Sequence, residues 1–243
     1  MFRIRYRLVT LLALAVTAPA AAHAPARQSC AAGARVAVGN EHVAYAAVAR
    51  GRTTAYRTPG RGAFVRFARE NVNRYPTVFS VVGKVVGPRC LATWYHVELP
   101  VRPNGATGWV RARDVVLQYV TTKIVVDVSV RRLELYRGGR RVLTTPAAVG
   151  AAGTPTPTGR YYVNQRLIPS DTRGPFGPAA LGVSAFSDVL TGWAQGGPIG
   201  IHGTNEPWSI GRAVSNGCIR VRNDVLRRLF KATPAGTPVL IRS

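Results

Sequence analysis

The chain has 243 residues, of which 33 are Lys or Arg and 10 are Asp or Glu, so its formal net charge is +23. This length is enough for one large domain or two small ones, and so basic a chain is expected to meet a polyanion. After the first 22 residues no stretch is long and apolar enough to cross a membrane, which excludes a later membrane span.

Residues 1–22 have the three parts of a secretory signal peptide. Three arginines lie within the first seven residues, residues 8–18 form a short apolar run, and residues 20–22 give an A-x-A cleavage signal. The apolar run is too short to span a bilayer comfortably. We therefore expect export to the cell envelope, with no stable membrane span after cleavage. An uncleaved membrane anchor is the alternative.

Export limits the kinds of partner that the positive charge indicates. The excess of basic residues remains after the arginines of the signal peptide are removed, but an exported protein rarely meets nucleic acid. We therefore expect the anionic polymers of a cell wall, and no nucleic acid, as partners. A biased genome composition would explain why arginine outnumbers lysine, though not the excess of basic over acidic residues.

The three cysteines are an odd number, and an unpaired cysteine in an exported protein marks a reactive thiol. Cys30 and Cys90 both lie in the N-terminal half and can form a disulfide, provided that the backbone geometry permits it. Cys218 is then the thiol left over.

Two units follow the signal peptide, and the first is predicted to be rich in strands. Residues 23–40 are rich in alanine and other small residues and are interpreted as a flexible lead-in. Residues 41–118 alternate apolar with polar residues in short segments cut by Gly, Pro and Asn, which predicts five or so strands. Within them, residues 64–73 are expected to form a helical turn or a loop. The pattern favours a small β-barrel.

Residues 122–243 form the second predicted unit, which starts as strand, strand, hairpin turn and strand. The turn is placed at residues 137–140, and a Pro-rich bend, TPTPTG, precedes a strand over residues 161–167. Residues 169–188 are predicted as a loop that folds over a cleft as a lid.

The second unit ends with a strand, a helix and a last strand. PIGIHGT predicts a short buried strand that stops at a glycine turn. Asn223 is predicted as the N-cap of a short amphipathic helix over residues 224–231, and GTPVLIRS predicts the final strand. The expected fold class is therefore mostly β, with a few short helices.

One histidine and one cysteine of this unit lie in contexts that favour nucleophilic catalysis. A thiolate attacks a carbonyl far better than a thiol, and a histidine in reach can take the proton and return it to a leaving amine. His202 ends one predicted strand and Cys218 begins the next, so neighbouring strands can bring them together. The alternative is a structural histidine and a small buried cysteine. An idle thiol is disfavoured in an oxidising compartment, and glycine flanks each residue.

Glycines and an arginine extend the predicted site. Gly217 lets the backbone approach a substrate, and the amides of Gly217 and Cys218 can face the oxygen of a tetrahedral intermediate. The Gly203 carbonyl can accept from one ring nitrogen of the histidine and so fix its tautomer. Arg220 can pair with a substrate carboxylate, with a solvated surface position as the alternative for it and for Arg222.

The sequence carries no signal for a metal or a cofactor. Its four histidines are scattered and give no C-x-x-C or H-x-x-x-H spacing. The stretches RGGRR and VGAAG lack the strand, loop and helix context of a phosphate site. We therefore expect chemistry that needs neither a metal nor a nucleotide.

Several motifs of the second unit together resemble a known family. IHGT, SNGCIRVRN, TPTPTG and IVVDVSVRRLELYRGGR are similar to motifs of the L,D-transpeptidase catalytic domain, also called the YkuD domain, over residues 123–241. The earlier segment WYHVELPVRPNGATGWV resembles bacterial SH3-like domains. The resemblance implies an SH3-like domain over residues 41–118, for wall binding or as a spacer, and a β-rich catalytic domain over residues 122–243.

The family resemblance also implies chemistry on the stem peptides of peptidoglycan. Cys218 would attack the carbonyl of the third stem residue, usually a diamino acid, and expel the terminal D-alanine. The acyl group would then pass to the amine of a neighbouring stem as a 3→3 cross-link. His202 would be the base and acid, oriented by Gly203, and carbapenems would acylate the thiol. The motif positions that shape the substrate site are Thr204, Ser215, Asn216 and Arg220.

One position departs from the family pattern. Many members have histidine directly before Gly-Cys, where this chain has Asn216, which cannot change its charge. A mechanism that needs a second imidazole is therefore not expected here. The rival interpretations are a sortase-like transpeptidase, a non-catalytic wall-binding protein, and an L,D-carboxypeptidase in which water accepts the acyl group. The sequence does not decide between the two L,D-activities.

Overall fold

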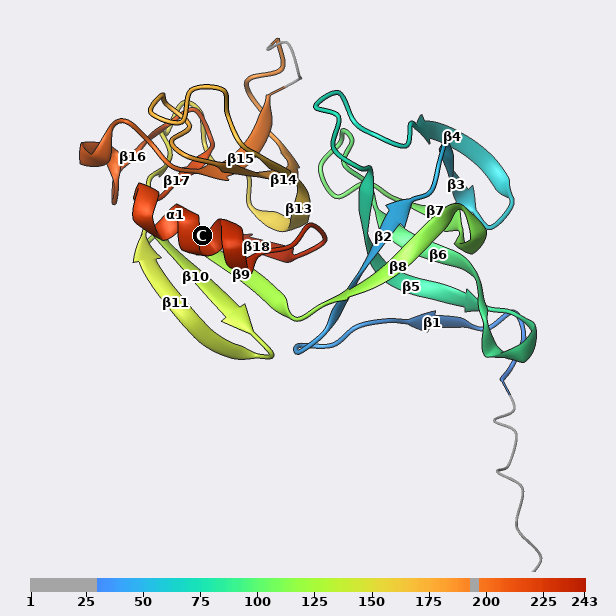
Figure 1. Cartoon of the computed structure of the whole chain (residues 1–243). Coiled ribbons are helices and arrows are strands. Elements are labelled where there is room, and N and C mark those ends of the chain that lie inside the picture. The colour runs from blue at the N-terminus through green and yellow to red at the C-terminus, as the bar shows by residue number, and fades with distance from the viewer. Residues whose placement is uncertain (1–29, 193–196) are drawn as a thin grey trace, which may run out of the picture.

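The computed structural model describes residues 30–192 and 197–243. The predicted signal peptide, residues 1–22, lies outside the described residues, as does the start of the predicted lead-in. The two halves of the chain form two separate eight-stranded sheets, and these lie side by side (Figure 1). A third, two-stranded sheet lies in the C-terminal half. None of the helices in the described part is long and apolar enough to cross a membrane.

The N-terminal half forms an antiparallel sheet of eight strands, in the order β4-β3-β7-β6-β5-β2-β8 with β1 paired to β5. Successive side chains of a strand point to opposite faces, so the alternating apolar residues of this half gather on one side. They form a core that includes the fully buried Phe79 and Val97. The elements are β1 (Arg35–Ala37), β2 (Ala44–Ala49), β3 (Thr53–Thr58), β4 (Arg61–Phe67), β5 (Val78–Val86), η1 (Pro88–Cys90), β6 (Ala92–Glu98), β7 (Thr107–Arg111), η2 (Ala112–Asp114) and β8 (Val115–Val120).

The N-terminal sheet confirms the expected strand-rich pattern and corrects two details. Residues 64–73 were expected as a helical turn or a loop, but β4 runs through Phe67 because its residues pair with β3. Residues 35–37 of the lead-in form a strand, since they pair with β5. Cys30 and Cys90 form a disulfide, which ties the start of the described chain to η1. The SH3-like assignment of this half stays a prediction.

The C-terminal half forms a second eight-stranded sheet in the order β11-β10-β9-β18-β13-β14-β15-β17. Two pairs are parallel, β9 with β18 and β15 with β17, and the other pairs in this sheet are antiparallel. The elements are β9 (Thr122–Asp127), β10 (Arg132–Arg137), β11 (Arg140–Pro146), β12 (Val149–Gly150), β13 (Gly159–Leu167), β14 (Ala180–Phe186), β15 (Pro198–His202), η3 (Pro207–Ser209), β16 (Ala213–Ser215), β17 (Ile219–Arg220), α1 (Asn223–Ala232) and β18 (Pro238–Arg242).

Most predicted elements of this half are present. The hairpin turn between β10 and β11 contains two glycines with positive φ, and β13, β15 and β18 lie where strands were expected. The prediction of a loop over residues 169–188 is wrong in its second part. Residues 180–186 form β14, which pairs with β13 and β15 and is almost entirely buried.

The start of the helix also differs from the prediction. Asn223 was expected to be the N-cap, but Arg222 occupies that position without a side-chain cap, and Asn223 is the first helical residue. The helix places Leu226 and Leu229 in the core of the C-terminal half. Its amphipathic character is therefore as expected. The side-chain amide of Asn223 does not cap the helix but forms hydrogen bonds with the backbone of Thr204.

The two halves are joined by a short connection and by direct contacts. Thr121 alone separates β8 from β9. The buried Tyr162 hydroxyl on β13 donates to the carbonyl of Val78 at 2.9 Å. The Asn104 side chain donates to the carbonyl of Phe186 at 2.8 Å. These contacts fix the N-terminal half against β13 and β14 of the C-terminal sheet.

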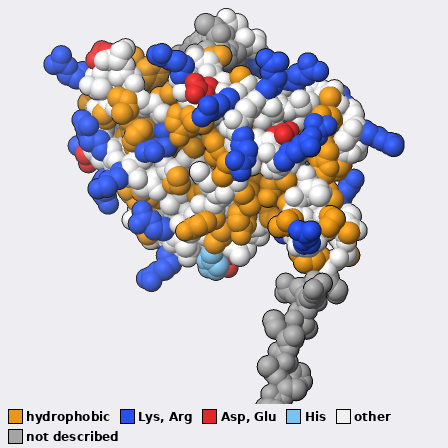
Figure 2. Space-filling model, turned by 45° about the vertical axis from the view of Figure 1, so that its right-hand side comes forward, with side chains coloured by type: hydrophobic (Ala, Val, Ile, Leu, Met, Phe, Trp, Pro, Cys, Tyr) orange, Lys and Arg blue, Asp and Glu red, His pale blue; other side chains and the backbone are white. Residues whose placement is uncertain are grey.

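The surface reflects the basic composition. On the face shown in Figure 2, Lys and Arg side chains are far more frequent than Asp and Glu side chains. Apolar side chains also gather in the middle of this face, between the scattered basic ones.

Candidate active site

The parallel pair β15 and β17 brings the predicted base and nucleophile together. In this pair Ile201 lies opposite Ile219, and His202 lies opposite Arg220. Because side chains alternate along a strand, Cys218, two residues before Arg220, faces the same side of the sheet as His202. Both side chains line one pocket of about 740 Å³. The expected juxtaposition of these two residues is therefore present.

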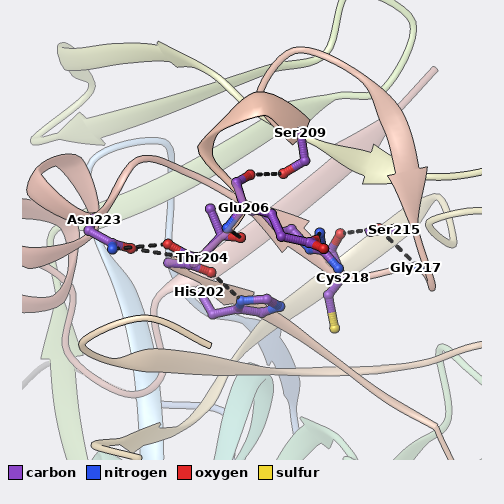
Figure 3. A network of polar contacts seen from close by, with 10 residues as sticks. His202, Thr204, Glu206, Ser209, Ser215, Gly217, Cys218 and Asn223 are labelled. Carbon is purple, nitrogen blue, oxygen red and sulfur yellow. Dashed lines mark hydrogen bonds and ion pairs between the residues drawn. The ribbon is translucent and has the colours of Figure 1, made fainter. Parts of the chain in front are cut away.

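His202 is held in one orientation and kept neutral. The side chain is buried, and its Nδ1 lies 2.6 Å from the carbonyl oxygen of Gly203 (Figure 3). A carbonyl only accepts, so Nδ1 carries the proton and Nε2 keeps a free lone pair. Burial lowers the pKa of His202 to about 4, and the nearby Arg220 charge also lowers it, while the Gly203 hydrogen bond opposes the shift. The imidazole is therefore a neutral base at pH 7.

Cys218 is a free, partly exposed thiol. Burial of the sulfur raises its pKa above the ordinary value, while a backbone hydrogen bond from Gly200 and the charge of Arg220 act in the opposite direction. With a neutral imidazole and a thiol of raised pKa, the resting pair is uncharged. Transfer of the thiol proton to the imidazole is therefore unfavourable in the resting site.

The turn that carries the thiol is fixed by hydroxyl groups. Ser215 Oγ donates to the carbonyl of Cys218 at 2.6 Å and accepts from the Gly217 N–H at 3.2 Å. Gly217 has φ +107°, a conformation that favours glycine, and an added Cβ would lie 3.0 Å from the Ile199 side chain. The structure thus requires glycine here for the backbone conformation and for the packing of Ile199, and the close approach of a substrate stays a prediction.

Two threonines of TPTPTG hold the same turn from the other side. Thr154 Oγ1 donates to the carbonyl of Ser215 at 2.9 Å. Thr156 Oγ1 donates to the carbonyl of Gly217 at 2.9 Å and accepts from the Gly150 N–H at 2.8 Å. The nucleophile turn is thus clamped by side chains about sixty residues earlier in the chain.

Comparison with known proteins identifies this half of the chain. Residues 121–241 match the family model described as the L,D-transpeptidase catalytic domain, YkuD. The chain belongs to the L,D-transpeptidase family through this domain. The match includes both residues of the pair and the TPTPTG turn.

Two curated relatives share this domain. A protein of Bacillus subtilis named as the L,D-transpeptidase YkuD is 40% identical over 119 residues, which is 49% of this chain and 64% of the relative. Its namesake from Bacillus licheniformis is 42% identical over 120 residues, with the same two coverages. The chain therefore spans less than two thirds of the length of each relative.

Among solved structures, the catalytic domain of the Enterococcus faecium L,D-transpeptidase is similar to this chain. The sequence identity is 28%, and the match covers 49% of this chain and 95% of that chain, with a TM-score of 0.37.

The predicted substrate-binding residues do not line the pocket; these are Thr204, Ser215, Asn216 and Arg220. Arg220 pairs with Glu206 at 2.5 Å, and its side chain is only 18% exposed. Arg222 and Asn216 are exposed. Arg220 is therefore already engaged by a carboxylate of this chain and is not free on the surface.

Thr204 and Asn223 form a clamp that sequence reasoning missed. Asn223 Oδ1 accepts from the Thr204 N–H at 2.8 Å, and its Nδ2 donates to the Thr204 carbonyl at 3.0 Å (Figure 3). The hydroxyl of Thr204 accepts from the Glu206 N–H at 2.9 Å. The clamp fixes the chain directly after His202 and Gly203, and so the carbonyl that orients the imidazole.

The missed residues left weak signals in the sequence. The alternation of Thr and Pro in TPTPTG puts two hydroxyls on one side of an extended segment, which favours binding to a neighbouring strand or turn. Asn223 offered no comparable signal, because an Asn before an amphipathic helix is equally typical of an N-cap. Among the described residues, no group of three His, Cys, Asp or Glu side chains could hold a metal ion.

Proposed function

We propose that the protein is an exported peptidoglycan L,D-transpeptidase that forms 3→3 cross-links through an acyl-enzyme on Cys218. The observation that carries the proposal is the shared pocket of a free thiol and a neutral imidazole in a domain of this family. The neutral Nε2 of His202 is available as a base because Nδ1 is committed to Gly203.

The proposed reaction has two acyl transfers. His202 Nε2 takes the thiol proton as Cys218 Sγ attacks the carbonyl of the third stem residue. The amide bond to the terminal D-alanine then breaks, and the imidazolium returns the proton to the leaving amine. In the second half, the side-chain amine of a neighbouring stem attacks the thioester, loses a proton to His202, and releases the thiol.

The intermediate oxyanion needs backbone donors. Both Gly217 and Cys218 were predicted to supply them, but the Gly217 N–H donates to Ser215 Oγ in this structure. We therefore assign the main donor role to the Cys218 N–H, with Gly217 joining only if Ser215 rotates. Loss of a single such donor costs about 3 kcal/mol in other enzymes.

A single imidazole serves both proton transfers in this proposal. Among the described residues that line the pocket, His202 is the only histidine. Asn216 stands where many members have a second one and is exposed. Because the proton returns to the same ring in each half-reaction, one imidazole is sufficient.

The proposed setting is the cell wall. The predicted signal peptide supports export, and the excess of basic side chains supports retention by anionic wall polymers. We propose that the N-terminal sheet, predicted as SH3-like, helps to hold the enzyme there. Its cross-links would contribute to wall biogenesis and cell shape.

Intact mass after incubation with a carbapenem tests the nucleophile. The wild-type chain should gain the mass of one inhibitor, and Cys218→Ala should gain none. His202→Ala should be acylated at least tenfold more slowly, whereas His42→Ala, a change to an exposed histidine away from the pocket, should match wild type. An adduct on Cys218→Ala would overturn the assignment of the nucleophile.

Stem tetrapeptides then separate the two L,D-activities. A transpeptidase gives 3→3 dimers, and an L,D-carboxypeptidase gives tripeptide and D-alanine without dimers. We expect dimers that disappear with Cys218→Ala. Tripeptide alone, in the presence of excess acceptor, would contradict the transpeptidase proposal and leave the acyl-enzyme intact.

A further inference from the structure

The pocket that holds the catalytic pair has a wall from the N-terminal half. Val72, Asn73 and Arg74, in the loop before β5, line it together with His202 and Cys218. The catalytic domain alone therefore does not complete its own pocket.

This loop has a defined conformation of its own. Asn71 Oδ1 accepts from the N–H groups of Asn73 and Tyr75 at 2.9 and 3.1 Å. The Asn71 N–H donates to the Tyr75 carbonyl at 2.8 Å, and the Arg74 N–H donates to the Asn71 carbonyl at 2.9 Å. Arg74 adopts φ +58°, which an L-residue takes up only where its surroundings hold it.

The loop is also bonded to the catalytic domain at the pocket wall. The side-chain amides of Asn71 and Asn73 both donate to Gln165 Oε1, at 2.7 and 3.0 Å. Gln165 lies on β13, is only 8% exposed, and itself lines the pocket. Two hydrogen bonds to one buried acceptor fix the loop relative to the sheet that carries the thiol.

Arg74 is the only charged side chain among the described residues that line this pocket. The other lining residues are largely apolar and include Leu167, Ile168 and Phe176. Arg74 has no ion pair with any described residue, in contrast to Arg220, which Glu206 occupies. Arg74 is exposed, and its unpaired guanidinium can donate two parallel hydrogen bonds to a carboxylate.

We infer that Arg74 binds a carboxylate of the donor stem peptide, so that the N-terminal half contributes a specificity residue to the catalytic pocket. This inference rests on the proposed function, since it takes the stem as the ligand. Stem peptides end in a carboxylate, and the pocket offers that group no other free cation among its described lining residues.

Steady-state kinetics of the full chain tests the inference. The substrates are a stem tetrapeptide ending in D-alanine, with every carboxylate free, and versions in which one carboxylate at a time is an amide. The variants are Arg74→Gln and Arg74→Lys. Arg89→Gln is the matched control, because Arg89 is an exposed arginine of the same half with the same φ of +58° but lies away from the pocket.

Arg74→Gln should raise KM for the free peptide about tenfold, with kcat within twofold, and Arg74→Lys should recover part of the loss. For one amidated peptide, wild type and Arg74→Gln should have equal KM, which identifies the carboxylate that Arg74 binds. Arg89→Gln should match wild type throughout.

Two results would overturn the inference while leaving the proposed function in place. One is an unchanged KM for Arg74→Gln on the free peptide. The other is an equal loss on every peptide, which would show that the substitution acts on loop structure instead of on a carboxylate. If wild type turns over none of the peptides, the proposed function fails and this inference fails with it.

Discussion

Acidification from pH 7 to pH 4 should destabilise the folded protein through His202. The folded protein holds this imidazole neutral down to about pH 4, because the ring is buried and an arginine lies near it. In the unfolded chain the same ring takes up its proton near pH 6.5. Between these two values the unfolded state binds more protons than the folded state, so the free energy of unfolding falls as the pH falls.

The size of the effect follows from the two pKa values. A difference of about 2.5 units corresponds to about 3 kcal/mol, fully present above pH 6.5 and lost by about pH 4. The assay is urea denaturation of wild type and of His202→Gln at several pH values in this window. Other titrating groups contribute equally to both proteins, so the difference between the two curves isolates the imidazole.

Wild type should lose about 3 kcal/mol more than His202→Gln between pH 7 and pH 4. Parallel curves would refute the reasoning, because they would mean that His202 titrates in the folded state as it does in the unfolded one. The imidazole would then be partly protonated near neutral pH, and a neutral resting pair with Cys218 would no longer describe the site.

Two further substitutions test the supports of the site by urea denaturation and by the rate of carbapenem acylation. Thr156→Val keeps the shape of the side chain but leaves two buried hydrogen-bond partners unsatisfied. It should lower the free energy of unfolding by about 2–4 kcal/mol and slow acylation. Thr158→Val, at an exposed position, should change neither quantity. Asn223→Ala removes both bonds of the clamp and should cost about 2–3 kcal/mol, with slower acylation because the carbonyl that orients His202 is released. Wild-type values for either variant would show that these contacts do not position the pair.

The sequence was sufficient to predict the core of the site. PIGIHGT was predicted as a short buried strand that ends near His202, and Cys218 was placed at the start of the next strand. These two strands, β15 and β17, are paired in the structure. The partner of the imidazole was also predictable, because Gly203 is its direct chain neighbour. Such inferences succeed because they depend on local geometry and on strand alternation.

The parts that sequence did not predict depend on contacts between distant residues. The residues next to Arg220 in the sequence do not indicate that Glu206 will form an ion pair with it. The strand over residues 180–186 was missed because its flanking Gly, Pro and Ser residues resemble a loop, while its pairing with two other strands decides its conformation. The contribution of Arg74 to the pocket depends on how the two halves meet, which no local pattern records.

The junction at Thr121 would limit how the proposed enzyme acts on an extended polymer such as peptidoglycan. Only one residue connects the two sheets, and hydrogen bonds cross their contact. The catalytic domain therefore cannot move far from the N-terminal sheet to reach a stem peptide. If the N-terminal sheet binds a surface, that binding also fixes the orientation of the Cys218 thiol. If the proposed function holds, peptidoglycan strands would have to reach the pocket by their own movement.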